Sequence, residues 1–412
     1  MPNKLWNRNY TLLITATVLG SAGAVASSFA LSFLVFDETG STLAAALLIA
    51  LQLIPAFIIP LLAAPLMDRY PRKPFLVAGD AVNGVLYTLA GWYLLKCEFS
   101  YAAYLGFSLL LHTLGTFDDL AYNSLYPNLI AEGCEQKGYA VSGTLYPVVK
   151  VIMTPVAAVL YDAVGVGVIL LVQGGLSLLA ALVESRIRID EPDRSGGERF
   201  SFKRWKGDLG EAMRYLKKEK GLRAIYTYMA VTNGVAYGYS PILVAFFRTA
   251  PGFSMVMYSA FSVAEFAGRT IGGLLHYHVK LPKEKQFGFA FFVYQFYDLM
   301  ELILLWVSYP FMLLSRVATG FLGVNSAAMR GAAIQSYIPD ELRAKLNAFD
   351  SMIISFSTAV IGLLVGAMGE MMDYRLCVTL CAAVSMSTCW LTIWRKRKDV
   401  RKIYQHEKSS EA

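Results

Sequence analysis

The chain has 412 residues, of which 56% are hydrophobic and only 16% are charged, and its mean hydropathy is +0.47. A soluble domain of this size does not expose so much apolar surface, so the composition excludes an ordinary soluble protein and indicates an integral membrane protein. The net charge of +7 does not indicate nucleic-acid binding, because Lys and Arg are concentrated in short segments between apolar stretches. Five scattered cysteines predict neither a disulfide framework nor a metal site.

Apolar stretches of about 20 residues, the length that crosses a bilayer core, recur along the whole chain. The first is too long for a signal-peptide core, so we expect an uncleaved helix there. The sequence predicts an all-α integral membrane fold of twelve transmembrane helices. Their predicted spans are Tyr10–Phe36, Thr42–Leu66, Pro74–Leu95, Tyr101–Ala121, Tyr139–Tyr161, Val164–Val183, Ala224–Phe247, Ser254–His276, Phe287–Trp306, Pro310–Arg330, Asn347–Gly369 and Leu376–Trp394.

One long polar segment divides these spans six to six. We therefore predict an N-terminal six-helix bundle (1–183), a cytoplasmic linker (184–223), a C-terminal six-helix bundle (224–394) and a basic cytoplasmic tail (395–412). Within the linker, Trp205 to Lys220 has the pattern of an amphipathic helix. The pair Gly362 and Gly366 indicates close helix packing inside one chain, and we expect a monomer.

The distribution of basic residues predicts the orientation of the spans. Of the 37 Lys and Arg, three (Lys96, Arg248 and Arg375) fall in the predicted outer loops. Four more (Lys150, Arg269, Arg316 and Arg330) lie inside the spans, which leaves 30 on the other side. Basic loops stay in the cytoplasm, so this asymmetry predicts a multi-pass protein of the inner (cytoplasmic) membrane with both termini in the cytoplasm. The basic tail is then expected to contact anionic lipid.

The loop after the second span carries the most specific motif. It resembles the loop motif of the major facilitator superfamily, Gly-x-Leu-Ala-Asp-Arg-x-Gly-Arg-Lys, and departs from it at Ala64 and Pro71. The matching residues are Leu66, Asp68, Arg69, Arg72 and Lys73. The loop after the eighth span weakly echoes this segment, as expected for two parallel halves. Asp80 and the loop from Asp37 to Ser41 are similar to those of the macrolide-efflux type of drug exporter in that superfamily.

The resemblance implies a cytoplasmic gate formed by Asp68, Arg69, Arg72, Lys73 and Asp80. In that family the cluster closes the cytoplasmic side when the transporter faces outward, and it does not touch substrate. Alternatively, the same charges serve only as a positive-inside topology anchor.

Ionisable residues inside a span are costly, so they are usually paired, hydrated or functional. In the first half, Asp118 and Asp119 are candidates for proton coupling, because neighbouring carboxylates repel each other and one of them tends to hold a proton. The alternative is that both are wet residues at the interface. Lys150, between two prolines, is a substrate-cavity candidate that we expect to pair with Asp118 or Asp119. His112 is a further cavity candidate, with a packing role as its alternative.

Besides Asp350, the second half contains three more acids within spans. Glu265 and Arg269 are four residues apart and share a helix face, which favours an ion pair. Asp298 and Glu301 also share a face. Each of these three acids is a candidate proton carrier, and Arg269 is a cavity candidate. Pairing of Asp298 or Glu301 with Arg269 or Arg316 inside the protein is the alternative.

The predicted seventh helix is rich in tyrosine. Tyrosine offers rigid apolar area and a hydroxyl group, which suits an amphipathic ligand, so Tyr226, Asn233 and Tyr237 are predicted to line the cavity. Arg330 is a further cavity candidate. It could pair with Asp350, and both could equally lie at the cytoplasmic surface.

The sequence contains no phosphate-binding loop, no recognisable nucleophile set and no metal motif, so we expect neither an enzyme nor a bound cofactor. We expect alternating-access transport of a small amphipathic or hydrophobic molecule. The family resemblance implies efflux by proton antiport, although a glycine-rich antiporter signature is missing around Pro155. The alternatives are a proton-coupled importer, a lipid flippase, and a membrane sensor or scaffold that transports nothing.

Overall fold

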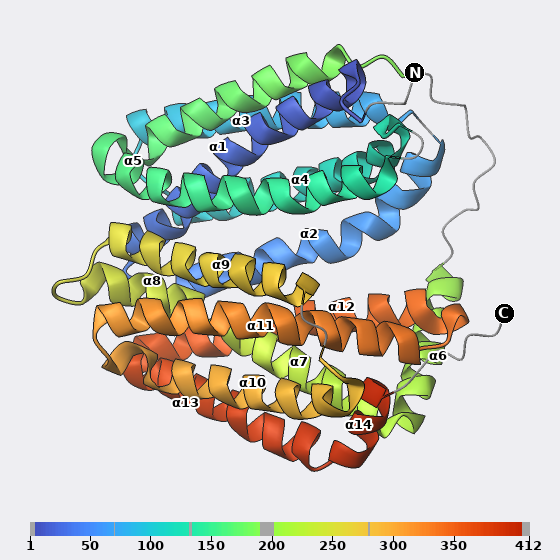
Figure 1. Ribbon diagram of the computed structural model, residues 1–412. Coiled ribbons are helices and arrows are strands. Elements are labelled where there is room, and N and C mark those ends of the chain that lie inside the picture. The colour runs from blue at the N-terminus through green and yellow to red at the C-terminus, as the bar shows by residue number, and fades with distance from the viewer. Residues whose placement is uncertain (1–4, 70, 132–133, 190–201, 279–280, 406–412) are drawn as a thin grey trace. The chain divides into compact units, whose positions relative to one another are not determined.

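The computed structural model describes residues 5–69, 71–131, 134–189, 202–278 and 281–405, and every regular element in these ranges is a helix (Figure 1). The chain forms two compact units. Unit 1 comprises Met1–Gly40 and Leu51–Phe200, and unit 2 comprises Ser41–Ala50 and Ser201–Ala412. Each unit is described by itself below.

Unit 1 contains α1 (Arg8–Thr39), most of α2 (Thr42–Arg69), α3 (Arg72–Lys96), α4 (Tyr101–Leu129) and α5 (Glu135–Ser185). The side chain of Asn7 caps α1 by accepting a hydrogen bond from the Tyr10 amide, and α1 ends at Gly40, whose φ of 62° is left-handed. Helix α5 is interrupted at Gly165, where φ is 76° and ψ is 168°. This break coincides with the predicted boundary between the fifth and sixth spans.

Glycines bring α3 and the second segment of α5 into backbone contact. A Cβ atom at Gly91 would lie 2.7 Å from the carbonyl oxygen of Gly167, and a Cβ at Gly84 would lie 3.0 Å from that of Gly174. Both distances are shorter than an ordinary van der Waals contact. Small residues therefore set the separation of these helices, as is common in membrane proteins.

Unit 2 contains α6 (Phe202–Lys218), α7 (Lys220–Gly238), α8 (Ser240–Thr249), α9 (Met255–His278) and α10 (Lys283–Ile303). It continues with a 3₁₀ turn (Leu304–Trp306), α11 (Tyr309–Tyr337), α12 (Asp340–Met371), α13 (Tyr374–Cys389), a π-helical turn (Trp390–Trp394) and α14 (Arg397–Gln405). The predicted seventh span is divided between α7 and α8, with Pro241 in the first turn of α8. Proline is favoured in the first turn of a helix, where its missing N–H leaves no intrahelical hydrogen bond unmade, so Pro241 fits the start of α8.

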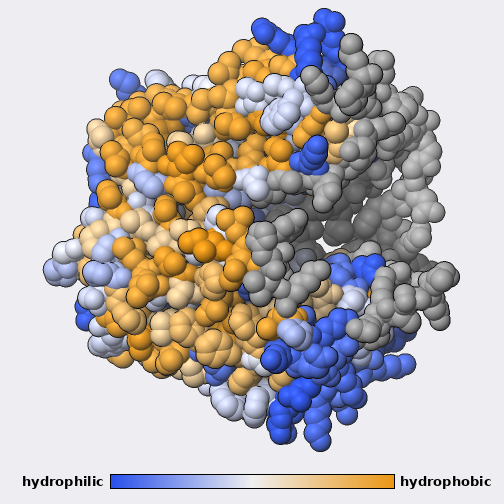
Figure 2. Space-filling model, viewed as in Figure 1, coloured by the Kyte–Doolittle hydropathy of each residue, from blue (hydrophilic) through white to orange (hydrophobic). Residues whose placement is uncertain are grey.

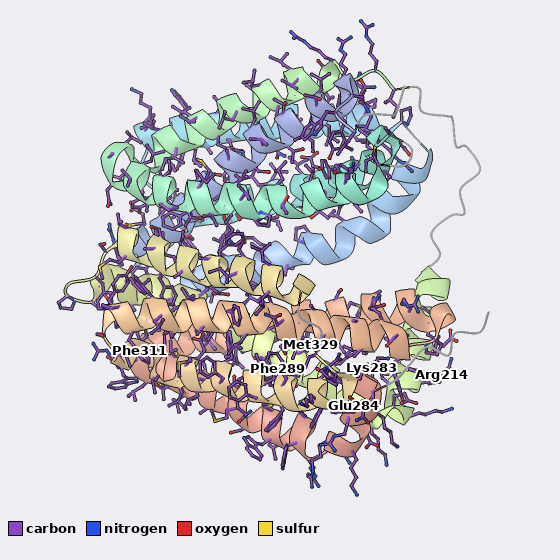
Figure 3. All side chains as sticks on the ribbon, in the orientation of Figure 1. Arg214, Lys283, Glu284, Phe289, Phe311 and Met329 are labelled. Atoms are coloured by element: carbon purple, nitrogen blue, oxygen red, sulfur yellow. The ribbon has the colours of Figure 1, made fainter. Side chains whose placement is uncertain are left out.

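Two amphipathic helices complete the core of unit 2. The predicted linker helix is present as α6, which buries Ala212 and Leu216. The basic tail also forms a helix, α14, and it buries Val400, Ile403 and Tyr404 in the same core. Figure 3 shows Arg214 of α6 and Lys283 of α10 at one end of this unit, and Phe311 of α11 at the opposite end.

The apolar surface of the helices is consistent with a membrane protein. Among the described residues, seven helical stretches are long and apolar enough to cross a membrane. They are Arg8–Thr39, Thr144–Ser185, Lys220–Thr249, Lys283–Trp306, Tyr309–Tyr337, Lys345–Met371 and Tyr374–Trp394. Figure 2 shows hydrophobic side chains over most of the visible surface of the coloured residues, with hydrophilic side chains gathered near helix ends.

The N-terminal part of α2, up to Ala50, belongs to unit 2 and contacts α12. The Glu370 carboxylate accepts hydrogen bonds from the Ser41 hydroxyl (2.7 Å) and the Leu43 amide (3.0 Å). Thr42 donates to the Gly366 carbonyl at 2.8 Å, next to the point where a Cβ at Gly366 would overlap Ala46. Gly362 faces Gly238 of α7. The two glycines therefore serve packing inside the chain, as predicted.

Helices α9 and α11 also meet backbone to backbone. A Cβ at Gly268 of α9 would overlap the Val317 carbonyl of α11, and a Cβ at Gly320 of α11 would overlap the Glu265 carbonyl of α9. Neither obstacle is a flexible side chain. Any larger residue at these positions must push the two helices apart.

We expect Gly268→Ala and Gly320→Ala each to destabilise the protein by about 1–3 kcal/mol, the usual cost of overpacking. Gly273→Ala is the matched control on α9, because a Cβ there has no neighbour within 4 Å, and it should be neutral or slightly stabilising. Thermal unfolding of the purified protein in detergent measures the difference. Equal melting temperatures for Gly268→Ala and Gly273→Ala would contradict the proposed backbone contact.

Candidate functional site

Asp118 lies at the contact between α3 and α4. Its carboxylate rests against Gly79, where a Cβ atom would overlap it, and its Oδ2 accepts a hydrogen bond from Asn83 Nδ2 at 2.8 Å. The other oxygen, Oδ1, is buried and has no hydrogen-bond partner among the described residues. A glycine on α3 thus provides the space for a carboxylate from α4 to enter the unit.

Two further carboxylates interact electrostatically with Asp118. They are Asp80 of α3 and Glu184, the last residue but one of α5. Glu184 is only 3% exposed, and its Oε2 has no hydrogen-bond partner among the described residues. We call Asp80, Asp118 and Glu184 the acid cluster. The sequence prediction missed Glu184, because it directly follows the apolar run and was assigned to the polar linker.

Two of the predicted gate residues are connected with this cluster: Asp80 belongs to it, and Lys73 contacts the residue that follows Glu184. Lys73 Nζ donates a 2.8 Å hydrogen bond to the carbonyl of Ser185, the last residue of α5. A cation at a helix C-terminus compensates the unpaired carbonyls and the helix dipole there. Arg72 also makes a polar or electrostatic contact. The side chains of Asp68 and Arg69 lie outside the described residues.

The remaining candidates of unit 1 do not join the acid cluster directly. Asp119 is exposed, because adjacent residues of a helix point about 100° apart and Asp118 occupies the inner face. Lys150 is exposed as well, and its side chain pairs with no other described residue. The expected ion pair between Lys150 and Asp118 or Asp119 is therefore wrong within the described part of the chain. His112 Nδ1 contacts the Ser108 carbonyl in its own helix at 3.0 Å.

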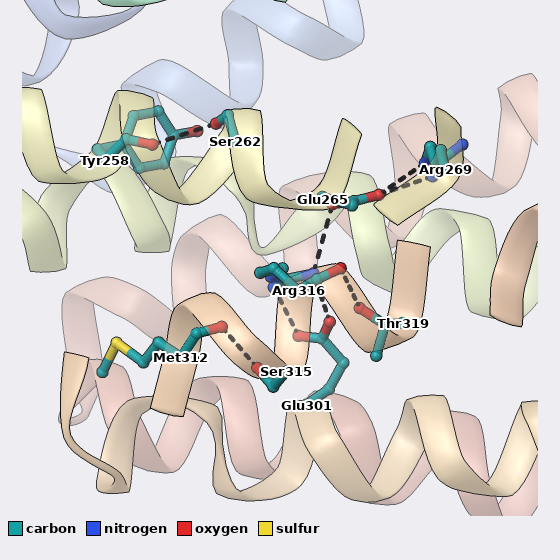
Figure 4. Close-up of polar contacts among 9 residues, drawn as sticks. All are labelled: Tyr258, Ser262, Glu265, Arg269, Glu301, Met312, Ser315, Arg316 and Thr319. Carbon is teal, nitrogen blue, oxygen red and sulfur yellow. Dashed lines mark hydrogen bonds and ion pairs between the residues drawn. The ribbon is translucent and has the colours of Figure 1, made fainter. Parts of the chain in front are cut away.

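Unit 2 holds a fully buried ion pair. Arg316 of α11 contacts Glu301 of α10 through both nitrogens of its fork, with Nη1 to Oε1 at 2.7 Å and Nη2 to Oε2 at 3.1 Å (Figure 4). Both side chains are 4% exposed. The guanidinium also lies 4.4 Å from the centre of the Phe261 ring. Pairing within the protein, one of the two predicted alternatives for Glu301, is thus confirmed.

Glu265 of α9 connects this pair to a second arginine. Its Oε1 accepts from Arg269 Nη2 at 2.7 Å and from Nε at 3.1 Å, which confirms the predicted ion pair. Its Oε2 lies 3.6 Å from Arg316 Nη1 (Figure 4). The close approach of α9 and α11 at Gly268 and Gly320 makes this sharing possible. We call Glu265, Arg269, Glu301 and Arg316 the ion-pair network.

Asp298 lies apart from this network. It is 2% exposed, interacts with Ser385 of α13, and has one oxygen, Oδ2, without a hydrogen-bond partner among the described residues. The alternative for this residue, pairing with Arg269 or Arg316, is not found among the described ion pairs, which include Glu301 instead.

Arg330 belongs to a different polar group within unit 2. Its Nη1 donates to the Tyr294 hydroxyl at 3.4 Å, and that hydroxyl lies 3.1 Å from the Tyr404 hydroxyl of α14. Arg330 also interacts electrostatically with Asp350 of α12, the predicted partner. Tyr294 thus links the tail helix to an arginine inside a predicted span.

The tyrosine-rich helix α7 separates into buried and exposed positions. Tyr226 is buried in the core of unit 2, and Asn233 donates to the Met229 carbonyl of its own helix at 2.7 Å. Tyr237 is 58% exposed and interacts electrostatically with Arg269. Of the three tyrosine-helix candidates, Tyr237 is therefore the one whose side chain is largely accessible beside a charged group.

The chemistry available to these groups is proton and ion-pair exchange. Among the described residues no group of three or more His, Cys, Asp and Glu could hold a metal ion. The acid cluster combines carboxylates that interact electrostatically with one another and, among the described residues, one donor group, the Asn83 amide. The ion-pair network, in contrast, balances two acids with two arginines.

Comparisons with known proteins agree with this architecture. The family model described as Major Facilitator Superfamily matches residues 12–296. Macrolide efflux protein A of Streptococcus pyogenes is 25% identical over 280 residues, which cover 66% of this chain and 64% of that protein. The match thus spans less than two thirds of the relative's length.

Solved transporter structures share the fold at low sequence identity. The nucleoside transporter NupG superposes with a TM-score of 0.68 at 13% identity, covering 97% of this chain and 100% of NupG. A bacterial homologue of the human lysosomal transporter Spinster, in an inward-facing and unoccupied conformation, gives 0.65 at 12% identity, covering 98% and 97%.

We expect Glu301→Met or Arg316→Met alone to lower the free energy of unfolding by about 3–5 kcal/mol, because each leaves a buried charge without its main partner. The double variant should be more stable than either single variant, since it removes both charges. Asp399→Asn, in the exposed pair with Lys402, is the control and should change stability by less than about 1 kcal/mol. A double variant less stable than both singles would refute the pairing.

Proposed function

The chain belongs to the major facilitator superfamily. We propose that it is a membrane transporter and moves a small amphipathic or hydrophobic molecule across the cytoplasmic membrane by proton-coupled alternating access, in the efflux direction. The resemblance to a protein named for macrolide efflux supports the direction and makes macrolides one substrate class to test. The energy source in this proposal is the proton gradient, with no bound cofactor.

We further propose that the chain crosses the membrane twelve times, as two six-helix bundles with both termini in the cytoplasm. Helix α5 supports this layout, because its 51 residues would extend about 76 Å at 1.5 Å per residue, more than twice the roughly 30 Å of a bilayer core. The reversal at Gly165 allows it to supply two spans. The basic loops all fall on one side in this arrangement.

The acid cluster is the observation that carries proton coupling. An ionised carboxylate inside the membrane costs several kcal/mol, and neighbouring carboxylates repel each other, so the cluster should retain at least one proton. Asn83 provides one hydrogen bond to Asp118, which leaves the buried oxygens of Asp118 and Glu184 able to exchange a proton. Lys73 of α3 binds the carbonyl of Ser185 at the end of α5, next to Glu184. In this proposal, that contact links protonation of the acid cluster to the cytoplasmic gate.

We expect Asp118→Asn and Glu184→Gln each to lower gradient-driven transport at least tenfold, because an amide cannot release a proton. The measurement uses sealed vesicles with an imposed pH gradient and a panel of anionic, neutral and cationic amphipathic compounds that includes macrolides. Glu98→Gln, at an exposed acid outside the helices, is the matched control and should transport normally.

Other outcomes of this experiment would replace the proposal. Movement of the panel that ignores the pH gradient and both substitutions would exclude proton coupling at the acid cluster. Gradient-driven accumulation into cells would indicate an importer, and movement of labelled lipids alone would indicate a flippase. If no compound moves with any gradient, the transport proposal fails and a sensor or scaffold becomes the better hypothesis.

The cysteines test the proposed orientation. Cys97 is exposed after α3, and we expect a membrane-impermeant maleimide to label it in intact cells. Cys134, before α5, should react only when the cytoplasmic face is accessible, as in inverted vesicles. Cys377, Cys381 and Cys389 are buried and should stay unlabelled in the folded protein. Labelling of Cys134 but not Cys97 in intact cells would reverse the orientation.

A further inference from the structure

The two arginines of the ion-pair network differ sharply in accessibility. Arg316 is 4% exposed and Arg269 is 57% exposed, although both contact Glu265. Arg316 has a complete second partner in Glu301, whereas Glu265 is the acid paired with Arg269 among the described ion pairs. Arg316 therefore has a structural role, and Arg269 is available for exchange.

Arg269 also lies deep within its helix. At 1.5 Å per residue it is about 21 Å from the first residue of α9 and about 13 Å from the last. A guanidinium that is more than half exposed at such a depth is costly against lipid, so it is expected to face water or a polar ligand. Tyr237, also more than half exposed, interacts with it and adds an aromatic surface.

Glu265 can break its contact with Arg269 and still keep an arginine partner, because Arg316 lies beside it. Its Oε2 already lies 3.6 Å from Arg316 Nη1, and a small rotation toward α11 would strengthen that contact. Arg269 uses Nε and Nη2 on the single oxygen Oε1. An incoming carboxylate could instead bind the planar fork through both of its oxygens, the geometry that arginine favours.

We propose that Arg269 is the polar anchor of a substrate site on unit 2, and that it binds the carboxylate of an amphipathic anion beside Tyr237 while Glu265 turns to Arg316. The proposal rests on the proposed transport function and narrows its substrate class. A carboxylate is favoured over other groups because a carboxylate, that of Glu265, already occupies the position. The apolar part of the anion would lie against the Tyr237 ring.

The test uses three fluorescent probes of similar size that differ in charge. They are dansylglycine, which is anionic, its methyl ester, which is neutral, and dansylethylenediamine, which is cationic. Binding to the purified full-length protein in nanodiscs is followed by dansyl fluorescence. The wild type should bind dansylglycine at least tenfold more tightly than the ester, and should bind the cationic probe no better than the ester.

Substitutions at Arg269 and at Glu265 are expected to change the affinity for dansylglycine in opposite directions. Arg269→Gln should remove the preference for dansylglycine and leave ester binding unchanged, and Arg269→Lys should retain part of the preference. Glu265→Gln should increase the affinity for dansylglycine, because it frees Arg269 from its competitor. Arg223→Gln, at an exposed arginine near the start of α7, is the control and should bind like the wild type.

Equal binding of dansylglycine and its ester by the wild type, or a preference that survives Arg269→Gln, would overturn the proposal. Tighter binding of the cationic probe that is lost in Glu265→Gln would also overturn it, in favour of a cation site at Glu265. Absence of binding by all three probes counts against it as well. Transport of the vesicle panel decides the separate question of whether the protein is a transporter.

Discussion

A charge inside an apolar helix costs several kcal/mol unless a partner or water compensates it, and the polar interior of each unit follows from that cost. Unit 2 compensates Arg316 with Glu301 through two contacts and with Glu265 through a third. Unit 1 instead gathers Asp80, Asp118 and Glu184 with one amide donor. The first arrangement holds its charges in balance, and the second leaves buried oxygens of Asp118 and Glu184 without a hydrogen-bond partner among the described residues.

These arrangements depend on glycine. Gly79 leaves room for the Asp118 carboxylate, and Gly268 and Gly320 bring α9 close enough to α11 for Glu265 to reach Arg316. In each case the obstacle to a larger residue is a backbone carbonyl or the Asp118 carboxylate itself. Small residues therefore determine which charged groups can meet, although they carry no charge themselves.

Patterns within one helix predicted local features well. The pair Glu265 and Arg269 was predicted because residues four apart share a helix face. Pairings between residues of different helices were harder to predict from the sequence. Lys150 was expected beside Asp118 and is exposed instead, while Glu184 was assigned to the linker and is buried. Sequence separation does not reveal how each helix is rotated about its axis.

The sequence by itself determined the membrane class, the approximate spans and the motif of the loop from Asp68 to Lys73, because hydropathy, charge bias and short motifs are local properties. The tertiary structure decided that Asp118 points inward and Asp119 outward, that Glu184 joins Asp80, and that Glu265 is shared by two arginines. These outcomes depend on the rotation and separation of packed helices. Backbone contacts between residues far apart in the chain set both quantities, and a linear sequence does not display them.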